Sequence, residues 1–334
     1  MRPGIGFGSS SRDRLIRSTG HQIRARSQRN ARVEIHTISP TLKLVDLRPP
    51  ISGYERFIGA YIFVGEKKAI IDPGPTSAIP NLLAALAELG MSPAEIDWII
   101  LTHIHIDHAG GAGTALRDMP RAKVLAHSQA LRHVADPTKL WEASLKTLGD
   151  LALQYGRIEP VPEDRIAAAA DLMAIDLGGG HVLEVHLTPG HAAHHLSLFD
   201  RKDGILIAGE AAGVCVNGAV RMATPPPFRL DETLSSIDRL ISLEPKTLCY
   251  GHFGCYGNAV ERLRLARAKL LAWHEIIGSA AREGKTPEEL LELLRHKDRD
   301  LDYLDALSRD AYRREHDLLI NSINGLGQSA RENG

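Results

Sequence analysis

Three histidines and one aspartate occur within the six residues from His103 to His108, in the segment "ILTHIHIDHAGG". The segment shortly before them, "IDWII", contains three isoleucines and a tryptophan, which predicts a buried strand. In an extended chain, residues two apart point to the same side, so His103 and His105 can reach one ion. Asp107 and His108 follow as the chain turns into glycine and alanine, whose small side chains would let the backbone pass close to a buried ion. These four side chains are candidate metal ligands at the end of a strand.

Strand and helix patterns alternate around this cluster. Strands are expected at residues 33–38, 42–47, 58–65 and 68–72, and a helix at 79–90 that ends at Gly90. A capped turn at 92–95 then leads into the strand before His103. The order strand, helix, strand predicts an α/β fold, and ligands collect beyond the carboxyl ends of strands in such folds. Further strands are expected at 122–127, 181–187, 195–200, 204–209 and 247–250, with a helix at 230–243.

Three more candidate ligands follow later strands. His191 stands in "LTPGHAAHHLSL", Glu210 in "LIAGEAAG" and His252 in "CYGHFG". Imidazole and carboxylate together suit Zn²⁺, with Mn²⁺ or Fe²⁺ as alternatives. Seven such groups exceed what one tetrahedral ion needs, but they suit two ions that share a carboxylate. A structural zinc site would more often use cysteines and leave no open position, so a catalytic site is favoured.

The same segments carry a family resemblance. "THIHIDHAGG" resembles the H-x-H-x-D-H signature of the metallo-β-lactamase superfamily of metal-dependent hydrolases. "IIDPG", "TPGHAAHHLSL", "LIAGE" and "YGHF" are similar to its remaining motifs and stand in the same order. The resemblance covers about residues 33–260. It implies an αββα sandwich of two mixed β-sheets flanked by helices, with two divalent metal ions, most often zinc, at one edge.

The resemblance also implies roles for single residues. His103, His105 and His191 resemble the ligands of a first metal, and Asp107, His108 and His252 those of a second. Glu210 stands where the family usually has a bridging aspartate. Glutamate is longer by one methylene, about 1.5 Å, so the bridge is either re-aimed or restricted to one ion.

Further implications concern the groups around the ligands. Asp72 resembles a carboxylate that orients a ligand histidine. His195 takes the place of a second family histidine that either supports the ligands or only packs, and His194, where glycine is usual, is a candidate to face substrate.

The implied activity is hydrolysis of a small ester, lactone or thioester. A water whose pKa the ions lower to about 7 would attack the carbonyl carbon, and Asp107 is the expected proton acceptor as well as a ligand. One alternative is a glyoxalase-II-like hydroxyacylglutathione thioesterase. Another is an oxidoreductase with a single iron, similar to a persulfide dioxygenase; the presence of both Asp107 and His108 favours two metals and hydrolysis instead. A non-catalytic relative would have lost ligands, and none is lost.

The net charge and the distribution of apolar residues argue against nucleic-acid and membrane partners. The formal net charge of the 334 residues is −1, which leaves no overall basic footprint for nucleic acid. No apolar run approaches the roughly 18 residues that a membrane span needs. Cys215, Cys249 and Cys255 are an odd number without C-x-x-C spacing, which favours a reducing, cytoplasmic location. The expected partner is a small-molecule substrate.

The two ends of the chain differ from the middle. Residues 1–32 hold eight arginines, no lysine and one acidic residue, a composition typical of a disordered tail and also of an organellar transit peptide. Residues 33–260 are expected to form the catalytic domain, and 261–334 a helical extension whose apolar face is covered by the same chain or in a homodimer. A further helix, with Trp141, Leu145, Leu148 and Leu151 on one face, is expected over residues 138–155.

Overall fold

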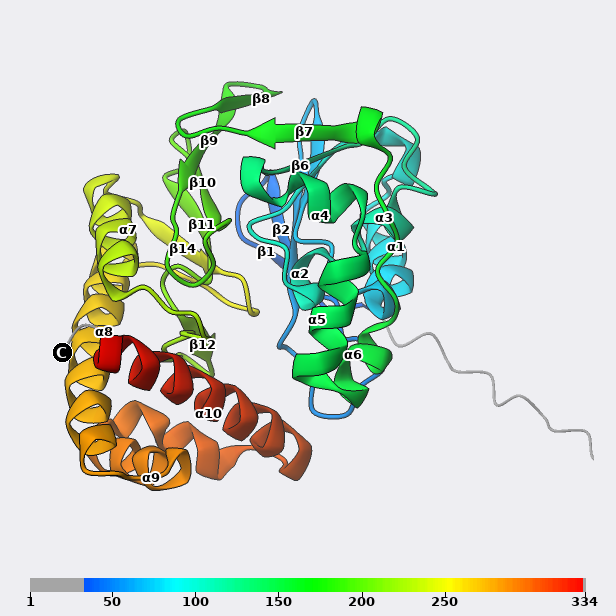
Figure 1. Ribbon diagram of the computed structural model, residues 1–334. Helices are drawn as coiled ribbons and strands as arrows, with labels where there is room; N and C mark the ends of the chain where they lie inside the picture. Colours follow the sequence, from blue (N-terminus) through cyan, green and yellow to red (C-terminus); the bar gives the residue numbers. More distant parts are fainter. Residues whose placement is uncertain (1–32, 333–334) are drawn as a thin grey trace, which may run out of the picture. The chain divides into compact units, whose positions relative to one another are not determined.

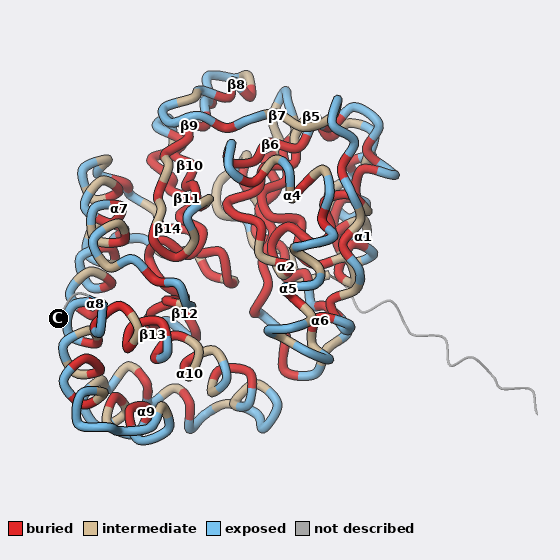
Figure 2. The backbone as a smooth tube through the Cα atoms, viewed as in Figure 1, coloured by how far each residue is buried: buried red, intermediate tan, exposed pale blue. Residues whose placement is uncertain are grey.

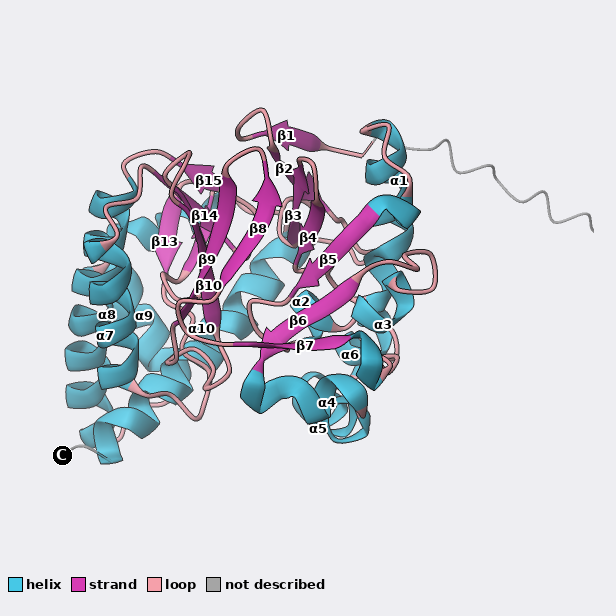
Figure 3. Cartoon of the chain, turned by 90° about the horizontal axis from the view of Figure 1, so that it is seen from above, coloured by secondary structure: helices cyan, strands magenta, loops and turns pink. Residues whose placement is uncertain are grey.

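The computed structural model describes residues 33–332, in which two mixed β-sheets lie side by side between two layers of helices (Figures 1 and 3). The first sheet has seven strands in chain order: β1 (Ile35–Thr37), β2 (Leu42–Asp46), β3 (Gly59–Val64), β4 (Lys68–Ile71), β5 (Ile96–Ile100), β6 (Lys123–His127) and β7 (Ile166–Ala169). The second has six, in the order β15 (Cys255–Tyr256), β14 (Thr247–Tyr250), β11 (Ile205–Gly209), β10 (Leu196–Asp200), β9 (His181–Leu187) and β8 (Ala174–Gly178). A separate hairpin joins β12 (Val214–Val216) and β13 (Ala219–Arg221). The predicted αββα sandwich is confirmed.

The helices form the two outer layers. Those that follow the strands of the first sheet are α1 (Ile79–Glu88), α2 (Ile106–Ala109), α3 (Ala112–Ala115), α4 (Leu131–Ala135), α5 (Thr138–Leu148) and α6 (Asp150–Tyr155). Those beside the second sheet are α7 (Leu230–Ser242), α8 (Ala259–Arg282), α9 (Pro287–Lys297) and α10 (Arg309–Glu332). Among the described helices, none has the combined length and apolar character required to cross a bilayer.

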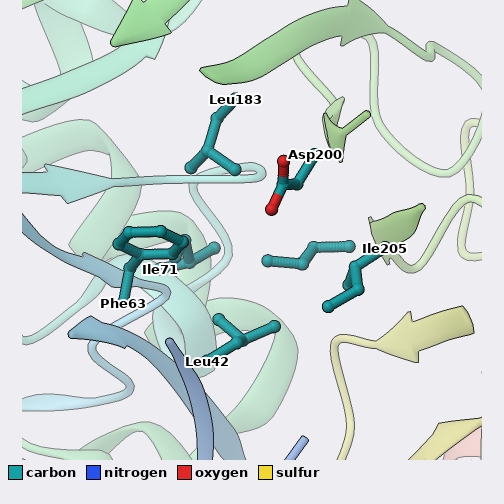
Figure 4. Close-up of a pocket in the computed structure, with 7 residues that line it drawn as sticks. Leu42, Phe63, Ile71, Leu183, Asp200 and Ile205 are labelled. Atoms are coloured by element: carbon teal, nitrogen blue, oxygen red, sulfur yellow. The ribbon is translucent and has the colours of Figure 1, made fainter. Parts of the chain in front are cut away.

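Three clusters of buried apolar side chains hold these layers together, and the buried backbone in Figure 2 follows them. One cluster fills the space between the two sheets and includes Phe63, Ile71 and Leu198. A small pocket remains inside it (Figure 4), lined by Leu42, Phe63, Ile71, Leu183, Asp200, Ile205 and Ile207. This pocket contains none of the candidate metal ligands, so it belongs to the packing of the sandwich.

Strand direction places the candidate ligands at one edge. β4 and β5 run parallel in the first sheet, and β11 and β14 run parallel in the second. Asp72 and His103 therefore follow the carboxyl ends of two neighbouring strands in the first sheet. Glu210 and His252 do the same in the second sheet. β9 and β10 are antiparallel to each other, so the loop between them, which carries His191, opens at the same edge as the end of β11.

Most predicted elements are present. α1 ends just before Gly90, and the capped turn at Ser92 forms a complete capping box, as does Thr286 at the start of α9. The strands β7, β8, β12, β13 and β15 were not predicted. The single helix expected over residues 138–155 is wrong, because the chain breaks at Gly149, where φ is 55°. That left-handed conformation is accessible to glycine and ends α5 before α6 begins.

The C-terminal helices pack on the second sheet. Leu263 and Trp273 of α8 and Leu319 and Ile323 of α10 are buried in one cluster with Leu248 of β14. The apolar face of α10 is thus covered within the chain, and burying it does not require the homodimer raised above. The boundary between a catalytic domain and a helical extension at residue 260 stays a prediction. The Arg-rich residues 1–32 lie outside the described residues.

A buried ion network ties α10 to the rest of the fold. Glu315 is fully buried and accepts hydrogen bonds from Arg221 Nε at 2.6 Å, Tyr303 Oη at 2.8 Å and Arg314 Nε at 3.1 Å. Burial acts to raise the pKa of Glu315, but the guanidinium groups of Arg221 and Arg314 outweigh it and hold that pKa below its usual value. This stabilisation is fully present above the usual glutamate range and is lost as the pH falls through the lowered pKa.

We expect Glu315→Ala to lower the free energy of unfolding by about 3–5 kcal/mol, because it leaves two buried guanidinium groups without a counter-charge. Urea unfolding at pH 7 measures the loss. Glu292→Ala is the control: Glu292 forms an exposed pair with Arg295 at 3.7 Å, which is worth at most about 1 kcal/mol. Equal, small losses in both variants would contradict the prediction.

Candidate metal centre

The structure brings all seven predicted ligands into one cluster, in two sets that touch. The first set comprises His103, His105, His191 and Glu210, and their ligand atoms all lie within 4.8 Å of one another. His105 Nδ1 is 3.0 Å from His103 Nε2 and 3.1 Å from His191 Nε2. Glu210 Oε2 lies 2.9 Å from His191 Nε2 and 3.4 Å from His103 Nε2. These distances leave three imidazole nitrogens and one carboxylate around a single small space.

The second set comprises Asp107, His108 and His252, again with all ligand atoms within 4.8 Å of one another. Asp107 Oδ2 is 3.7 Å from the Nε2 atoms of both His108 and His252. Glu210 reaches this set too, with Oε1 at 3.3 Å from His252 Nε2 and Oε2 at 3.7 Å from His108 Nε2. The longer side chain thus spans both sets, in the position of a bridge.

Backbone carbonyl groups orient two of the histidines from outside. His191 Nδ1 donates to the carbonyl oxygen of Ala223 at 2.9 Å, and His252 Nδ1 donates to that of Phe57 at 3.2 Å. Each hydrogen bond keeps the proton on Nδ1. The Nε2 atom therefore presents its lone pair to the centre of the cluster.

Asp72 orients two more of the histidines, in the place that the resemblance implied. Thr102 Oγ1 donates to Asp72 Oδ2 at 2.6 Å and therefore accepts from His103 Nδ1, at 3.1 Å. His108 Nδ1 donates to the same carboxylate oxygen at 3.2 Å. The role of Thr102 was missed from the sequence, although it directly precedes His103 and a hydroxyl there is a usable signal.

The donor set fits a divalent cation. Five imidazole rings place a ring nitrogen at the cluster, and the Nε2 of His108 is buried with no hydrogen-bond partner among the described residues. Lone pairs packed this closely repel one another unless a proton or a cation lies between them. Two sets with a shared carboxylate could hold two ions, each with the nitrogen and oxygen ligands that zinc accepts.

Electrostatics in the first set keep two candidate ligands, His105 and Glu210, in the forms that bind a cation. Burial, together with the charge of His191, lowers the pKa of His105 to about 3, so its ring is neutral at pH 7. Burial alone would raise the pKa of Glu210, but the charges of His191 and His252 hold it well below its usual value. Glu210 is therefore an ionised carboxylate, as a metal ligand must be.

The second set carries an excess of negative charge. Burial acts to lower the pKa of His108, yet the carboxylates of Asp107 and Asp72 raise it to about 10. Such a shift measures how strongly this space favours positive charge. A cation bound there would neutralise the same carboxylates.

The two other histidines of the "HAAHH" segment differ in surroundings. His195 is fully buried, and its Nε2 accepts the backbone N–H of Glu210 at 3.1 Å, so its Nδ1 donates to Thr188 Oγ1 at 2.8 Å. It therefore fixes the backbone of Glu210. His194 is half-buried with its ring centroid 6.2 Å from that of His105, and burial lowers its pKa to about 4. Its Nδ1 has no partner among the described residues.

The residues of the cluster differ in their exposure to solvent. His105, Asp107 and His194 are half-buried, whereas His103, His108 and His252 are almost fully buried. A substrate can therefore reach the centre past the first three residues.

Gly111, one of the small residues after His108, makes a close backbone contact away from the cluster. A Cβ on Gly111 would lie 2.9 Å from the carbonyl oxygen of Gly74 and 2.5 Å from Ile79 Cδ1. The Gly111 N–H donates to that same carbonyl at 2.8 Å. Glycine is required for this close contact with the loop after β4, and not for an approach to the metal space.

Comparisons with known proteins agree with this geometry. The model of the "Metallo-beta-lactamase superfamily" matches residues 55–252. The chain is 35% identical over 199 residues to "Metallo-beta-lactamase fold-containing protein ST1585" of Sulfurisphaera tokodaii, covering 58% of this chain and 72% of the relative. It is 27% identical over 217 residues to "Probable metallo-hydrolase YqjP" of Bacillus subtilis, covering 58% of this chain and 66% of that relative.

A solved structure extends the likeness beyond the matched residues. The metallo-beta-lactamase family protein TTHA1429 from Thermus thermophilus superimposes with a TM-score of 0.65 at 26% identity, covering 89% of this chain and 95% of that one. Since only 11% of this chain lies outside the match, the match includes C-terminal helices. Fold, motifs and matched residues together establish that this chain belongs to the metallo-beta-lactamase superfamily.

Proposed function

We propose that this chain is a hydrolase that cleaves a small ester, lactone or thioester. It would use two divalent metal ions, with zinc as the expected metal. The observation that carries the proposal is the position of Glu210. Its two oxygens lie 2.9 Å from His191 Nε2 and 3.3 Å from His252 Nε2, so one carboxylate serves both sets of ligands. Two ions that share a carboxylate suit hydrolysis better than the chemistry of a single iron.

Each group of residues in the cluster has a proposed role in hydrolysis. The two sets of residues would hold the ions, which would supply a Lewis acid and lower the pKa of a water to about 7. Asp107 lies at the open side of the cluster, with a side chain 20% exposed, and is placed to accept the proton that this water loses. His194, neutral at pH 7 and beside His105, can donate a hydrogen bond to substrate.

The substrate class is proposed from the chemistry of the site. An electrophilic carbonyl carbon is the partner for a water made nucleophilic at neutral pH, and the half-buried entrance formed by His105, Asp107 and His194 suits a small molecule. Among such substrates we place lactones and simple esters before glutathione thioesters, because the entrance residues His105, Asp107 and His194 offer no guanidinium or ammonium group for the glutathione carboxylates.

Purified protein, analysed for metal and assayed on lactones, aryl esters and glutathione thioesters, tests the proposal. We expect about two equivalents of zinc, manganese or iron, and turnover of a lactone or ester. Turnover of glutathione thioesters alone would favour the glyoxalase-II-like alternative. One equivalent of iron, with consumption of oxygen in the presence of a persulfide, would replace hydrolysis by the oxidoreductase alternative.

Glu210→Asp is expected to retain two bound ions or to bind them more tightly, because aspartate keeps the charge of the bridge while shortening it by about 1.5 Å. Metal content after dialysis measures this. Glu210→Gln is the matched control, since it keeps the length without the charge, and should lose the second ion. Loss of both ions in Glu210→Asp would show that the site is built around the longer side chain.

We also propose a cytoplasmic location, because the three cysteines are free of disulfide bonds. Cell fractionation tests this, with organellar import through residues 1–32 as the competing result.

A further inference from the structure

A stack of three side chains links α10 to the second set of ligands. The Phe57 ring stacks on the His252 imidazole, with ring centroids 4.2 Å apart and planes at 25°. The Arg314 guanidinium carbon lies 3.8 Å from the centroid of the same phenyl ring. Since two groups this close to one centroid cannot share a face, Arg314 and His252 cover opposite faces of Phe57.

The backbone around Phe57 holds the same ligand. The Phe57 carbonyl oxygen accepts the His252 Nδ1 proton, and Ile58 forms a β-bridge with His252. The orientation of His252 is therefore set by the ring, the carbonyl group and the backbone of one short segment, residues 53–58. Any shift of that segment would move the ligand atom.

The start of α10 fixes this segment. Arg314 donates through Nη1 to the carbonyl oxygen of Gly53. A Cβ on Gly53 would lie 2.6 Å from the backbone nitrogen of Ala311, so the two backbones are in direct contact. Ser52 Oγ also donates to Asp310 Oδ2, at 2.5 Å.

Arg314 itself has little freedom to move. Its side chain is 5% exposed, and Nε donates to the fully buried Glu315, which is bonded in turn to Arg221 and Tyr303. A planar guanidinium is suited both to the face of an aromatic ring and to directed hydrogen bonds. The ion network thus presents a rigid cationic surface to Phe57.

We propose that Arg314 is a positioning residue for the second metal, acting through Phe57 on His252, so that the C-terminal helix completes the metal centre. The proposal rests on the proposed function, because it takes His252 as a ligand of the second ion. It assigns to α10 a role in the site, beyond covering the second sheet.

Arg314→Met tests the proposal, because it keeps an apolar chain of similar length while removing the cation and the directed hydrogen bonds. Loss of outer partners of a ligand typically weakens metal binding about 10–100-fold. We expect the affinity of the second Zn²⁺ to fall by that factor and that of the first to stay unchanged, in competition titrations with a chromophoric chelator. The Co²⁺-substituted protein should lose the absorption bands of its second equivalent selectively.

Arg313→Met is the matched control, because Arg313 is the exposed neighbour on the same helix and both affinities should stay as in the unchanged chain. If Arg314→Met does not fold, Phe57→Leu carries the same expectation while leaving the ion network in place. Two unchanged affinities, or equal weakening of both ions, would overturn the positioning role. An unchanged chain that binds fewer than two ions would instead refute the proposed function.

Discussion

Replacing His105 by alanine is expected to abolish turnover and to remove bound metal. His105 Nδ1 stands 3.0 Å and 3.1 Å from the Nε2 atoms of His103 and His191, so it is the central member of the first set. Its pKa of about 3 leaves the ring neutral and able to bind a cation at pH 7. Without that ion, the pKa of the attacking water returns from about 7 towards 15.7.

Turnover should therefore fall by at least about three orders of magnitude. Metal analysis and the rate on the best substrate of the panel are measured on the same sample of His105→Ala. The control is His296→Ala, at an exposed histidine of α9, which should keep both metal and rate. A His105→Ala protein with full activity would mean that the assigned ligands are wrong.

The position of the site could be predicted because two physical rules act together. Residues two apart in an extended chain share a side, which joins His103 to His105. Parallel strands present their carboxyl ends at one edge, which brings Glu210 and His252 together. The position of His191 could be predicted only from the family resemblance. No local rule places a residue in a loop between antiparallel strands beside His105.

The parts that could not be predicted depend on contacts between distant segments. Nothing in the local sequence of Arg314 indicates that it covers Phe57, since helical periodicity states only which face is apolar. The charged pair Arg314 and Glu315 would be placed on a solvated surface by composition alone, yet both are buried. The burial of Glu315 depends on Arg221, which supplies a counter-charge from the β12–β13 hairpin, and Arg314 is buried beside the same carboxylate.

Weak strand signals explain the missed strands. β7 has the sequence "IAAA", and alanine is depleted in strands, so the pattern does not distinguish a strand from a loop. It is held instead by pairing with β6, from His127↔Ala169 to Val124↔Ile166. The break at Gly149 was missed for a related reason, because apolar spacing continues from Leu148 to Leu151 on either side of it.

Asp107→Asn is expected to lower turnover by about 10²–10⁴-fold, the usual contribution of a positioned proton acceptor. The amide is nearly isosteric, so it keeps one oxygen 3.7 Å from His108 Nε2 and His252 Nε2, but it cannot take up the proton. It also lacks the negative charge that raises the pKa of His108 to about 10, and the second ion should bind more weakly. Asp118→Asn, at an exposed aspartate, is the control.

Adding Zn²⁺ in excess separates the two roles of Asp107. If the second ion returns to Asp107→Asn and turnover does not, the carboxylate acts on the proton as well as on the metal. If turnover returns together with the ion, Asp107 is a ligand alone, and another group must receive the proton. His194 does not qualify as that group, because a pKa of about 4 leaves it a weak base at neutral pH. Full turnover by Asp107→Asn without added metal would exclude both roles.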